Sequence, residues 1–294
     1  MEVLFEMSLV PFKEDPERKK KVIEELLRGS SRSAEVQGEG MIVKTKDGYL
    51  FTNIAYQGRI LPAVELSGGL LDSGKQRTQE QWVQYSVDGW CATDAEVLYQ
   101  CLLRAYDLRN DSKCRAVVQD LNKVFQQVFD PAKPYINTLT KISYGTGLDG
   151  IVSRLGRFPG NAQNKSIIIP EFTKANDSWS YFVLANEQSE SKLGATNVLH
   201  ANARPVLEAM LGKGYEKAGS VFQYFSTRKD SNLRETRLWT PTTTNRNSER
   251  VLVLGVVSSD DGFGVDSDGV IGDYGPALGV RRAKNISTRN EGAQ

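Results

Sequence analysis

Histidine is almost absent from this sequence: among 294 residues, the only histidine is His200. Histidine is the most frequent metal ligand and general base in proteins, so its scarcity excludes a histidine-rich zinc site. Any Ser-His or Cys-His catalytic pair would have to use His200. Because His200 precedes Ala-Asn-Ala-Arg-Pro, which indicates the approach to a helix, we expect a structural role for it.

Cysteines and long apolar stretches are also scarce. Cys91, Cys101 and Cys114 have no close metal-type spacing, so we expect reduced, packed thiols. The longest strongly apolar run, Val251–Val257, is far shorter than a membrane span. Met1–Phe12 has no apolar core of signal-peptide length. We therefore expect a chain without a membrane span that is made in the cytoplasm, which is compatible with a later place in a virion or on a cell surface.

An excess of charge of one sign is lacking as well, because 37 Lys and Arg residues face 36 Asp and Glu residues. No overall field attracts nucleic acid or an anionic membrane, so we expect neither as a partner. The 39% hydrophobic and 25% charged residues are ordinary for a globular protein. The length suits one large domain or two small ones.

Residues 1–130 predict helices and one hairpin. Asp15-Pro16 and Asp94 are typical helix-start residues, and Asp47-Gly48 is typical of a two-residue hairpin turn. This N-terminal part is either separate or integral to the fold that follows. The predicted elements are a helix over Glu17–Arg28, a hairpin of Met41–Lys46 and Tyr49–Tyr56, and amphipathic helices over Ala95–Leu108 and Asp111–Phe129.

Residues 131–294 have a different texture, in which short β-like runs alternate with Gly, Asn and Ser. Short strands with much loop favour an α+β fold over a parallel α/β sheet. One helix is predicted near Arg204–Leu211, ending at Gly212. The predicted strands are Tyr135–Tyr144, Ser166–Ile169, Trp179–Ala185, Val221–Phe225, Thr236–Trp239 and Val251–Val257.

The stretch Leu238–Asn285 is rich in Gly, Asp and small polar residues. Gly accepts positive φ and Asp bonds its own backbone, so we expect mostly irregular surface loop between two short buried anchors. A long loop inside a compact domain is usually functional. Tyr274 has no apolar immediate neighbours, which predicts an exposed position at a loop tip. Such a tyrosine offers a large contact area at a low entropy cost.

Two motifs resemble ligand sites only in part. Gly145-Thr146-Gly147 with Gly150 lacks the Gly-Lys-Ser/Thr ending of a phosphate-binding loop. An EF-hand loop that starts at Asp266 would need Glu at its twelfth position, where Ala277 stands. We predict neither a cofactor nor a metal ion, and a looser calcium site remains an alternative.

Four short motifs between residues 181 and 283 resemble a known family. Tyr181–Glu187 is similar to a strand entering the module, Arg237–Pro241 to a Trp-containing strand, Val265–Val270 to an Asp-Gly turn and Leu278–Ala283 to a closing Gly-Val-Arg strand. Their order resembles the C-type lectin fold in the branch of formylglycine-generating enzymes and of the variable proteins of diversity-generating retroelements.

This resemblance implies a C-type lectin fold in the C-terminal part and, in the retroelement family, a last segment that is rewritten by mutagenesis at adenines. The Gly-Gly-Ser-Trp signature of the enzyme branch is missing, and no cysteine follows Cys114. The Glu-Pro-Asn and Trp-Asn-Asp patterns of calcium-dependent sugar binders are missing too. Formylglycine-generating chemistry and calcium-dependent sugar binding are therefore not expected.

We accordingly predict a non-enzymatic ligand-binding protein with a variable region at about residues 238–285, which recognises a protein or glycan on another cell or virus host. One alternative is a lectin-fold oxidoreductase that uses copper or a cysteine pair. A second is a structural virion or assembly protein that interacts through its N-terminal helices. The predicted binding residues are Thr240, Thr242, Thr244, Asn245, Arg246, Asn247, Ser259, Asp260, Asp261, Phe263, Asp266, Asp273 and Tyr274.

Overall fold

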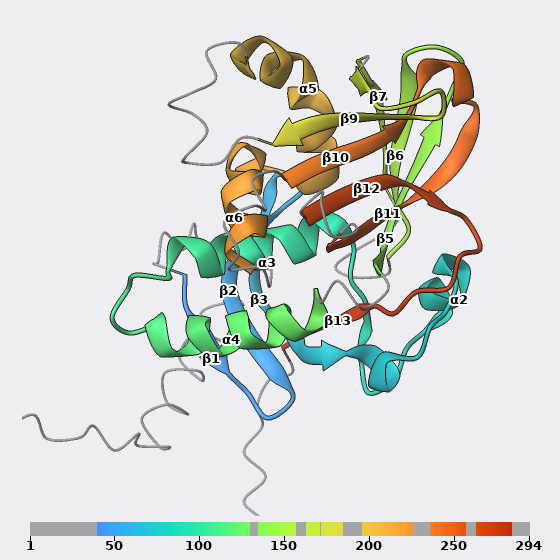
Figure 1. Cartoon of the computed structure of the whole chain (residues 1–294). Coiled ribbons are helices and arrows are strands. Elements are labelled where there is room, and N and C mark those ends of the chain that lie inside the picture. Colours follow the sequence, from blue (N-terminus) through green and yellow to red (C-terminus); the bar gives the residue numbers. More distant parts are fainter. Residues whose placement is uncertain are drawn as a thin grey trace, which may run out of the picture. The chain divides into compact units, whose positions relative to one another are not determined.

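A computed structural model describes seven stretches of the chain, all within one compact unit, Gln37–Ala283 (Figure 1). The predicted boundary at residue 130 falls inside this unit. The predicted helix over Glu17–Arg28 lies outside the described residues. The described residues are 40–129, 135–156, 163–170, 172–184, 196–225, 236–256 and 263–283.

The first sheet joins the beginning of the unit to its end. Its five strands are antiparallel and follow the order β1-β2-β3-β13-β4. The predicted hairpin is confirmed as β1 and β2, but its turn lies one residue earlier, at Lys46-Asp47, because the Thr45 amide bonds the Gly48 carbonyl and Gly48 begins β2. The last strand, β13, lies between β3 and β4 and so closes the unit. The strands are β1 (Ile42–Lys44), β2 (Gly48–Tyr56), β3 (Arg59–Leu70), β4 (Cys91–Ala92) and β13 (Leu278–Arg282).

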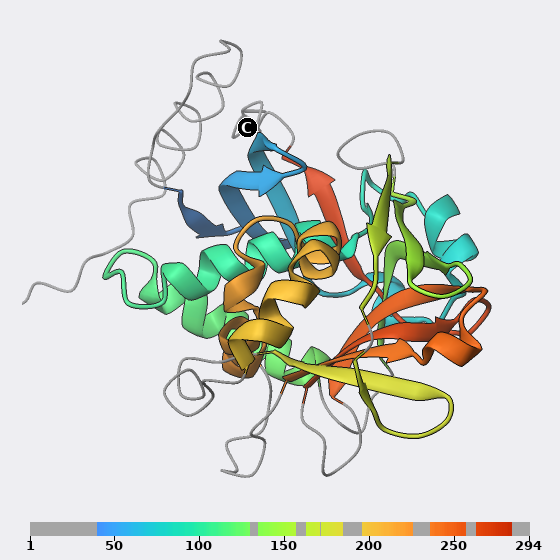
Figure 2. The same ribbon diagram turned by 90° about the horizontal axis from the view of Figure 1, so that it is seen from above.

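Two amphipathic helices, α3 (Ala95–Asp107) and α4 (Arg115–Val128), cover this sheet, as the spacing of their apolar residues predicts. The Asp94 side chain caps α3 by accepting a hydrogen bond from the Val97 amide at 2.8 Å. Helix α4 begins four residues later than predicted, because Asp111 instead closes a turn that leads to it. Figure 2 shows α3 and α4 against the first sheet, with two further helices on the other side of α3.

The second sheet has eight strands in the order β7-β6-β5-β11-β12-β10-β9-β8, and it curls. All its neighbouring strands are antiparallel except β10 and β12. The strands are β5 (Ile136–Tyr144), β6 (Asp149–Arg154), β7 (Gln163–Ile168), β8 (Thr173–Lys174), β9 (Trp179–Leu184), β10 (Thr236–Pro241), β11 (Ser248–Val256) and β12 (Phe263–Val270).

The helices α5 (Thr196–Leu211) and α6 (Ala218–Phe225) contact both α3 and the second sheet. The prediction of a strand over Val221–Phe225 is wrong, because this run belongs to α6. Its Val221, Phe222 and Phe225 are completely buried. A short apolar run of this kind is ambiguous between a buried strand and a buried helix, and here the preceding turn, Tyr215–Lys217, continues into a helix.

The prediction that Leu238–Asn285 is mostly irregular loop is also wrong, because most of its described residues form strands. Phe263–Val270 is a central strand of the second sheet, and its Val265 and Ser267 are completely buried. Gly269 lies so close to β11 that an added Cβ would be 2.9 Å from the Val251 carbonyl oxygen. Here glycine permits close approach of a neighbouring strand and does not mark a turn.

The described residues form a mixed α+β fold, as predicted. The completely buried core includes residues from both sheets and from α3, such as Phe51, Leu252 and Val265 of the strands and Leu98 of the helix. Among the helices of the described stretches, none is both long and apolar enough to cross a lipid bilayer. A short helix, α2 (Gln79–Gln84), and three 3-10 turns complete the fold.

Candidate ligand-binding surface

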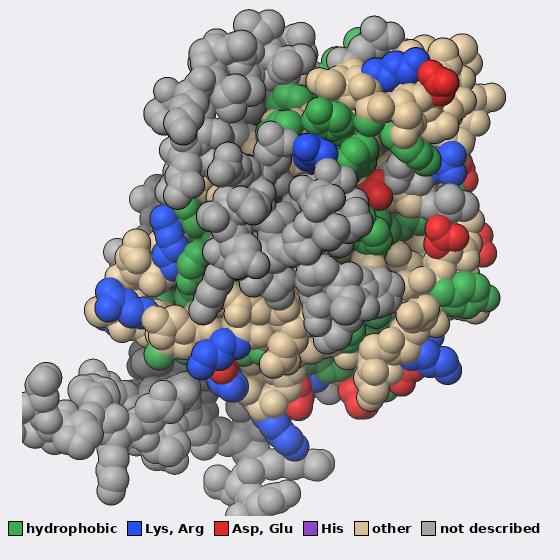
Figure 3. Space-filling model, in the orientation of Figure 1, with side chains coloured by type: hydrophobic (Ala, Val, Ile, Leu, Met, Phe, Trp, Pro, Cys, Tyr) green, Lys and Arg blue, Asp and Glu red, His purple; other side chains and the backbone are tan. Residues whose placement is uncertain are grey.

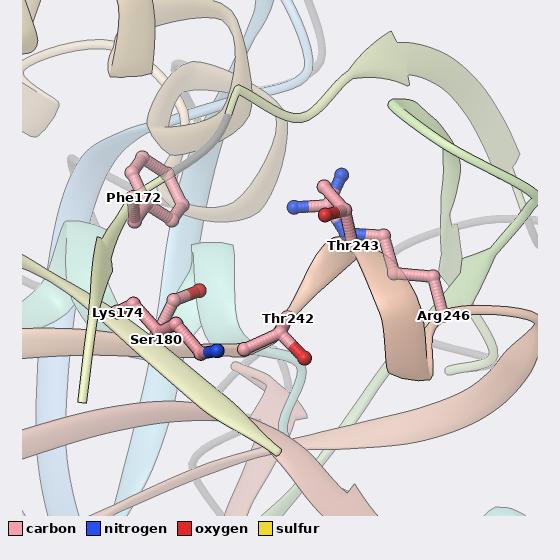
Figure 4. A pocket seen from close by; sticks show the side chains of 6 residues that line it. All are labelled: Phe172, Lys174, Ser180, Thr242, Thr243 and Arg246. Carbon is pink, nitrogen blue, oxygen red and sulfur yellow. The ribbon is translucent and has the colours of Figure 1, made fainter. Parts of the chain in front are cut away.

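An open cleft lies at the edge of the second sheet, between the β8–β9 hairpin and the loop that follows β10 (Figure 4). Its volume is ≈ 380 Å³, counting the solvent at its mouth. The hairpin and the loop are more than 60 residues apart in sequence, so the sheet is what brings them together. The residues that line the cleft are Phe172, Lys174, Ser180, Thr242, Thr243 and Arg246.

The loop after β10 is fixed by hydrogen bonds to the turn between β8 and β9. The Thr242 amide donates to the Ser178 carbonyl at 2.9 Å, and the Thr242 hydroxyl donates to the Asp177 carbonyl at 2.8 Å. The Asn245 side-chain amide donates to the same Asp177 carbonyl at 3.2 Å. One wall of the cleft therefore has a well-supported backbone, although it is a surface loop.

Arg246 fastens this loop to the opposite end of the curled sheet. Its Nη1 donates to the carbonyls of Gly147 and Ile169, both at 2.9 Å, and its Nη2 donates to the Pro170 carbonyl at 3.2 Å. The planar guanidinium spreads its donors over several nitrogens, so it can reach carbonyls that lie further apart than the donors of a compact ammonium can span. The Gly145–Gly147 turn, which resembled a phosphate loop in part, therefore provides an anchor for Arg246.

A half-buried aromatic and charged face, the Trp239 face, lies on the other side of the same strands and consists of Tyr181, Arg237, Trp239 and Asp266. On β9 and β10, the Tyr181 and Trp239 rings pack with their centroids 5.3 Å apart, and the Arg237 guanidinium lies 4.6 Å from the Tyr181 ring. Asp266 of β12 is the register partner of Trp239. Figure 3 shows hydrophobic side chains gathered with basic and acidic ones over these strands. Tyrosine, tryptophan and arginine are the residues most enriched at binding hot spots.

The indole N–H of Trp239 belongs to the interior of this face. Within the described part of the chain, its Nε1 is shielded from solvent and has no hydrogen-bond partner. A buried N–H group without an acceptor costs about 1–3 kcal/mol, so this group destabilises the face slightly, and the exposed part of the ring is what a ligand can contact.

The predicted binding residues divide into several groups. Thr244, Asn245 and Asn247 are exposed on the loop after β10, while Asp266 is half-buried on the Trp239 face. Asp273 and the 62% exposed Tyr274 belong to a different loop, so they do not line the cleft. Ser259, Asp260 and Asp261, together with the side chain of Phe263, lie outside the described residues.

Three of the predicted binding residues need correction because they are buried. Thr240 is completely buried, and its hydroxyl lies 2.9 Å from the Ser180 hydroxyl, so it supports the sheet and cannot face a ligand. Thr242 and Arg246 do line the cleft, but both are more than nine-tenths buried and act mainly as anchors of the loop.

Four cleft residues, Phe172, Lys174, Ser180 and Thr243, were not predicted from the sequence. Phe172 and Lys174 lie just before the short strand β8 and on it, in a stretch without a strong sequence pattern. The Phe172 ring packs 5.5 Å from the Phe182 ring of β9, which places Phe172 in the cleft wall. Only the pairing of β8 with β9, a tertiary feature, reveals this position.

The cysteines show none of the features of a redox or metal site. Burial raises the pKa of Cys91 to about 11 and raises the pKa of Cys101 as well, so both thiols are protonated at neutral pH. Cys114 is a free, buried thiol. Within the described stretches, no group of three His, Cys, Asp or Glu side chains is placed to hold a metal ion. His200 lies in α5, and its side chain is outside the described residues.

Comparisons of this chain with models of protein families, with curated proteins and with solved structures gave no match.

Proposed function

We propose that this chain is a non-enzymatic ligand-binding protein on a C-type lectin scaffold of the kind found in the variable proteins of diversity-generating retroelements. Its C-terminal surface recognises a protein or glycan on another cell or on the host of a virus. The recognition surface consists of the Trp239 face and the loop over residues 242–247. The stretch Leu238–Ala283 is its diversified region.

One observation carries this proposal: rigid strands lead directly into exposed side chains. Strand β10 has its Leu238 completely buried and presents Arg237 and Trp239 on the half-buried face. It then ends in a loop whose backbone is held by Asp177 and Ser178, while Thr244 is exposed. A fixed backbone that presents exposed side chains allows recognition to change without a change of fold.

The strand that closes the first sheet adds support. The Gly-Val-Arg motif lies in β13, where Leu278 and Val280 are buried and Arg281 bonds the N-terminal hairpin. These residues form a framework that ends the segment. This arrangement suits a region whose two ends are constant and whose middle differs from copy to copy.

The DNA around the gene tests the proposal. We expect a near-identical copy of the stretch encoding Leu238–Ala283 beside a reverse-transcriptase gene, differing from it only at adenines of the copy. The altered codons should encode exposed residues such as Thr244 and Asn245, while the codons of Leu238 and Val265 stay unchanged. Absence of such a copy, or differences that fall as often on buried residues, would contradict the proposal.

A further inference from the structure

The geometry points to a ligand for the cleft between β8, β9 and the loop after β10: a sugar unit that carries a carboxylate. This inference rests on the proposed ligand-binding function and names the chemistry of the ligand. A uronic acid or a sialic acid has the required groups, namely one carboxylate, several hydroxyls and a ring with an apolar face.

The charge of the cleft favours an anion. Two of the six lining residues, Lys174 and Arg246, are cationic, and none of the six is acidic. Figure 4 shows Lys174 and Ser180 on one side of the cleft and Thr242 and Thr243 on the other. A concave site lined by charge of one sign attracts ligands of the opposite sign.

Lys174 is the cation that can exchange its partner. Its Nζ bonds Asp177 Oδ1 at 2.8 Å, and the two side chains are 63% and 100% exposed. A surface ion pair of this kind contributes little to stability, so an incoming carboxylate can replace Asp177. Arg246 is different, because its guanidinium holds three backbone carbonyls and adds positive charge from a fixed position.

The hydroxyl oxygens of the cleft can accept hydrogen bonds from donors on the ligand. The Thr242 hydroxyl donates its proton to the Asp177 carbonyl and lies 3.1 Å from the Thr244 hydroxyl, so its oxygen is left with one further acceptor position. Ser180 shares its hydroxyl hydrogen bond with Thr240 and likewise keeps a lone pair for a ligand. A simple carboxylic acid cannot supply donors to these oxygens at neutral pH, whereas the hydroxyls of a sugar can.

Size and shape agree with one sugar unit. Without the solvent at its mouth the cleft has a volume of ≈ 130 Å³, which is below the roughly 300–1,000 Å³ of drug-sized ligand sites, so it holds at most one sugar unit. Phe172 provides an apolar wall against which the C–H face of a pyranose ring can pack, and Phe182 keeps the Phe172 ring in place. Neither a metal ion nor one of the side chains of the Trp239 face is needed for this mode of binding.

Titration of the full-length chain with D-glucuronate, N-acetylneuraminate, D-glucose and acetate, followed by NMR or calorimetry, tests the inference. We expect one of the two acidic sugars to bind with a Kd of about 10 mM or below, and at least about tenfold more tightly than glucose and acetate. The variant Lys174→Gln should lose about tenfold in affinity. The variant Asp177→Asn should gain affinity because it frees the Lys174 ammonium.

Lys217→Gln is the matched control, because Lys217 is a half-exposed lysine that bonds Asp107 at the same 2.8 Å but lies outside the cleft. Unchanged thermal melting of each variant shows that the fold is intact. Equal binding of glucose, equal binding of acetate, unchanged affinity of Lys174→Gln, or no binding of either acid at about 20 mM would overturn the inference. The proposed function is decided separately by the DNA test, so the two can fail independently.

Discussion

Arg281 in the closing strand lies with its Nε 2.6 Å from Glu65 Oε2 in β3, 216 residues earlier in the chain. Its Nη2 also bonds Asp47 Oδ2 at 2.9 Å, and its guanidinium lies 4.1 Å from the Trp90 ring. The Arg281 and Glu65 side chains are mostly buried, with exposed fractions of 15% and 8%. One residue therefore ties β13 to the hairpin turn, to β3 and to the aromatic residue before β4.

We predict that Arg281→Met lowers the free energy of unfolding by about 2 kcal/mol, because it leaves the Glu65 carboxylate buried without its partner. Urea denaturation measures this loss. Adding Glu65→Gln should recover part of the loss, since the uncompensated charge is then removed. Arg282→Met, at the exposed neighbouring position, is the control and should change stability by less than about 0.5 kcal/mol. Equal effects of the two methionine variants would contradict the prediction.

Arg246 offers a second test, at the place where the ends of the curled sheet meet. Arg246→Lys keeps the charge but cannot reach three carbonyls at once, so we expect a loss of about 2–4 kcal/mol in unfolding free energy. Thermal melting and urea denaturation measure it.

Arg115→Lys is the matched control for Arg246→Lys, because Arg115 is exposed and its side chain makes a long 3.4 Å hydrogen bond to the Asn110 carbonyl. It should leave stability unchanged within about 0.5 kcal/mol. If Arg246→Lys is as mild as this control, then Arg246 does not hold the sheet closed.

The first hairpin and the two helices that cover the first sheet could be predicted from the sequence because local signals determine them. Asp47-Gly48 marks the hairpin turn to within one residue, and Asp94 caps a helix whose apolar side then faces the sheet. The long strand β3 and the short strand β4 were not predicted. Strand β12 could not be predicted in this way. Its Gly and Asp residues favour turns. It is a strand because it lies between β10, with which it pairs in parallel, and β11, with which it pairs antiparallel.

The candidate site also combines features that the local sequence predicts with features that only the tertiary fold determines. The loop after β10 was predicted as a binding region from its small polar residues, and Thr244 and Asn245 are indeed exposed there. The burial of Arg246 and the presence of Lys174 in the same cleft depend on hydrogen bonds and strand pairing over long sequence distances. No pattern within either segment contains that information.

A buried acidic pair should make stability depend on pH. Burial raises the pKa of both Asp94 and Glu96, and the attraction of Arg154, whose Nη2 lies 2.5 Å from Glu96 Oε2, offsets part of this rise. A carboxyl whose pKa is higher in the folded state binds its proton more tightly there. Its charged form therefore costs stability at high pH, and this cost disappears as the pH falls through the folded-state pKa.

Surface carboxyls have the opposite effect, because their protonation lowers the free energy of unfolding at low pH. Hydrogen bonds from Lys44 and Lys141 lower the pKa of Asp120 and Glu249, so these groups stabilise the fold until the pH falls below about 4, near the unfolded-state values. We predict that the free energy of unfolding, measured by urea denaturation, decreases as the pH rises from about 4 and the acidic pair becomes charged in the folded state. Glu96→Gln should flatten this dependence, and stability that rises steadily toward pH 8 would contradict the assignment.

Two threonines, one on β10 and one on the loop that follows it, differ sharply in burial. Thr240 is completely buried, with its hydroxyl 2.9 Å from that of Ser180, whereas Thr244 is exposed and its hydroxyl bonds only the neighbouring Thr242 among the contacts of the described residues. Replacing Thr240 leaves the Ser180 hydroxyl without this partner and opens space in the sheet. We therefore expect Thr240→Ala to lower the free energy of unfolding by about 1–3 kcal/mol, and Thr244→Ala to change it by less than about 0.5 kcal/mol.

A stronger form of the comparison replaces each threonine by tyrosine and measures melting temperature and far-ultraviolet circular dichroism. Tyrosine at position 244 points into solvent, so the fold should be retained, whereas tyrosine at position 240 must displace core side chains and should unfold the sheet. If Thr244→Tyr were as damaging as Thr240→Tyr, the loop could not accept new side chains. Its role as a surface that changes its recognition would then be untenable, because diversification requires the backbone to remain in place whichever residue it carries.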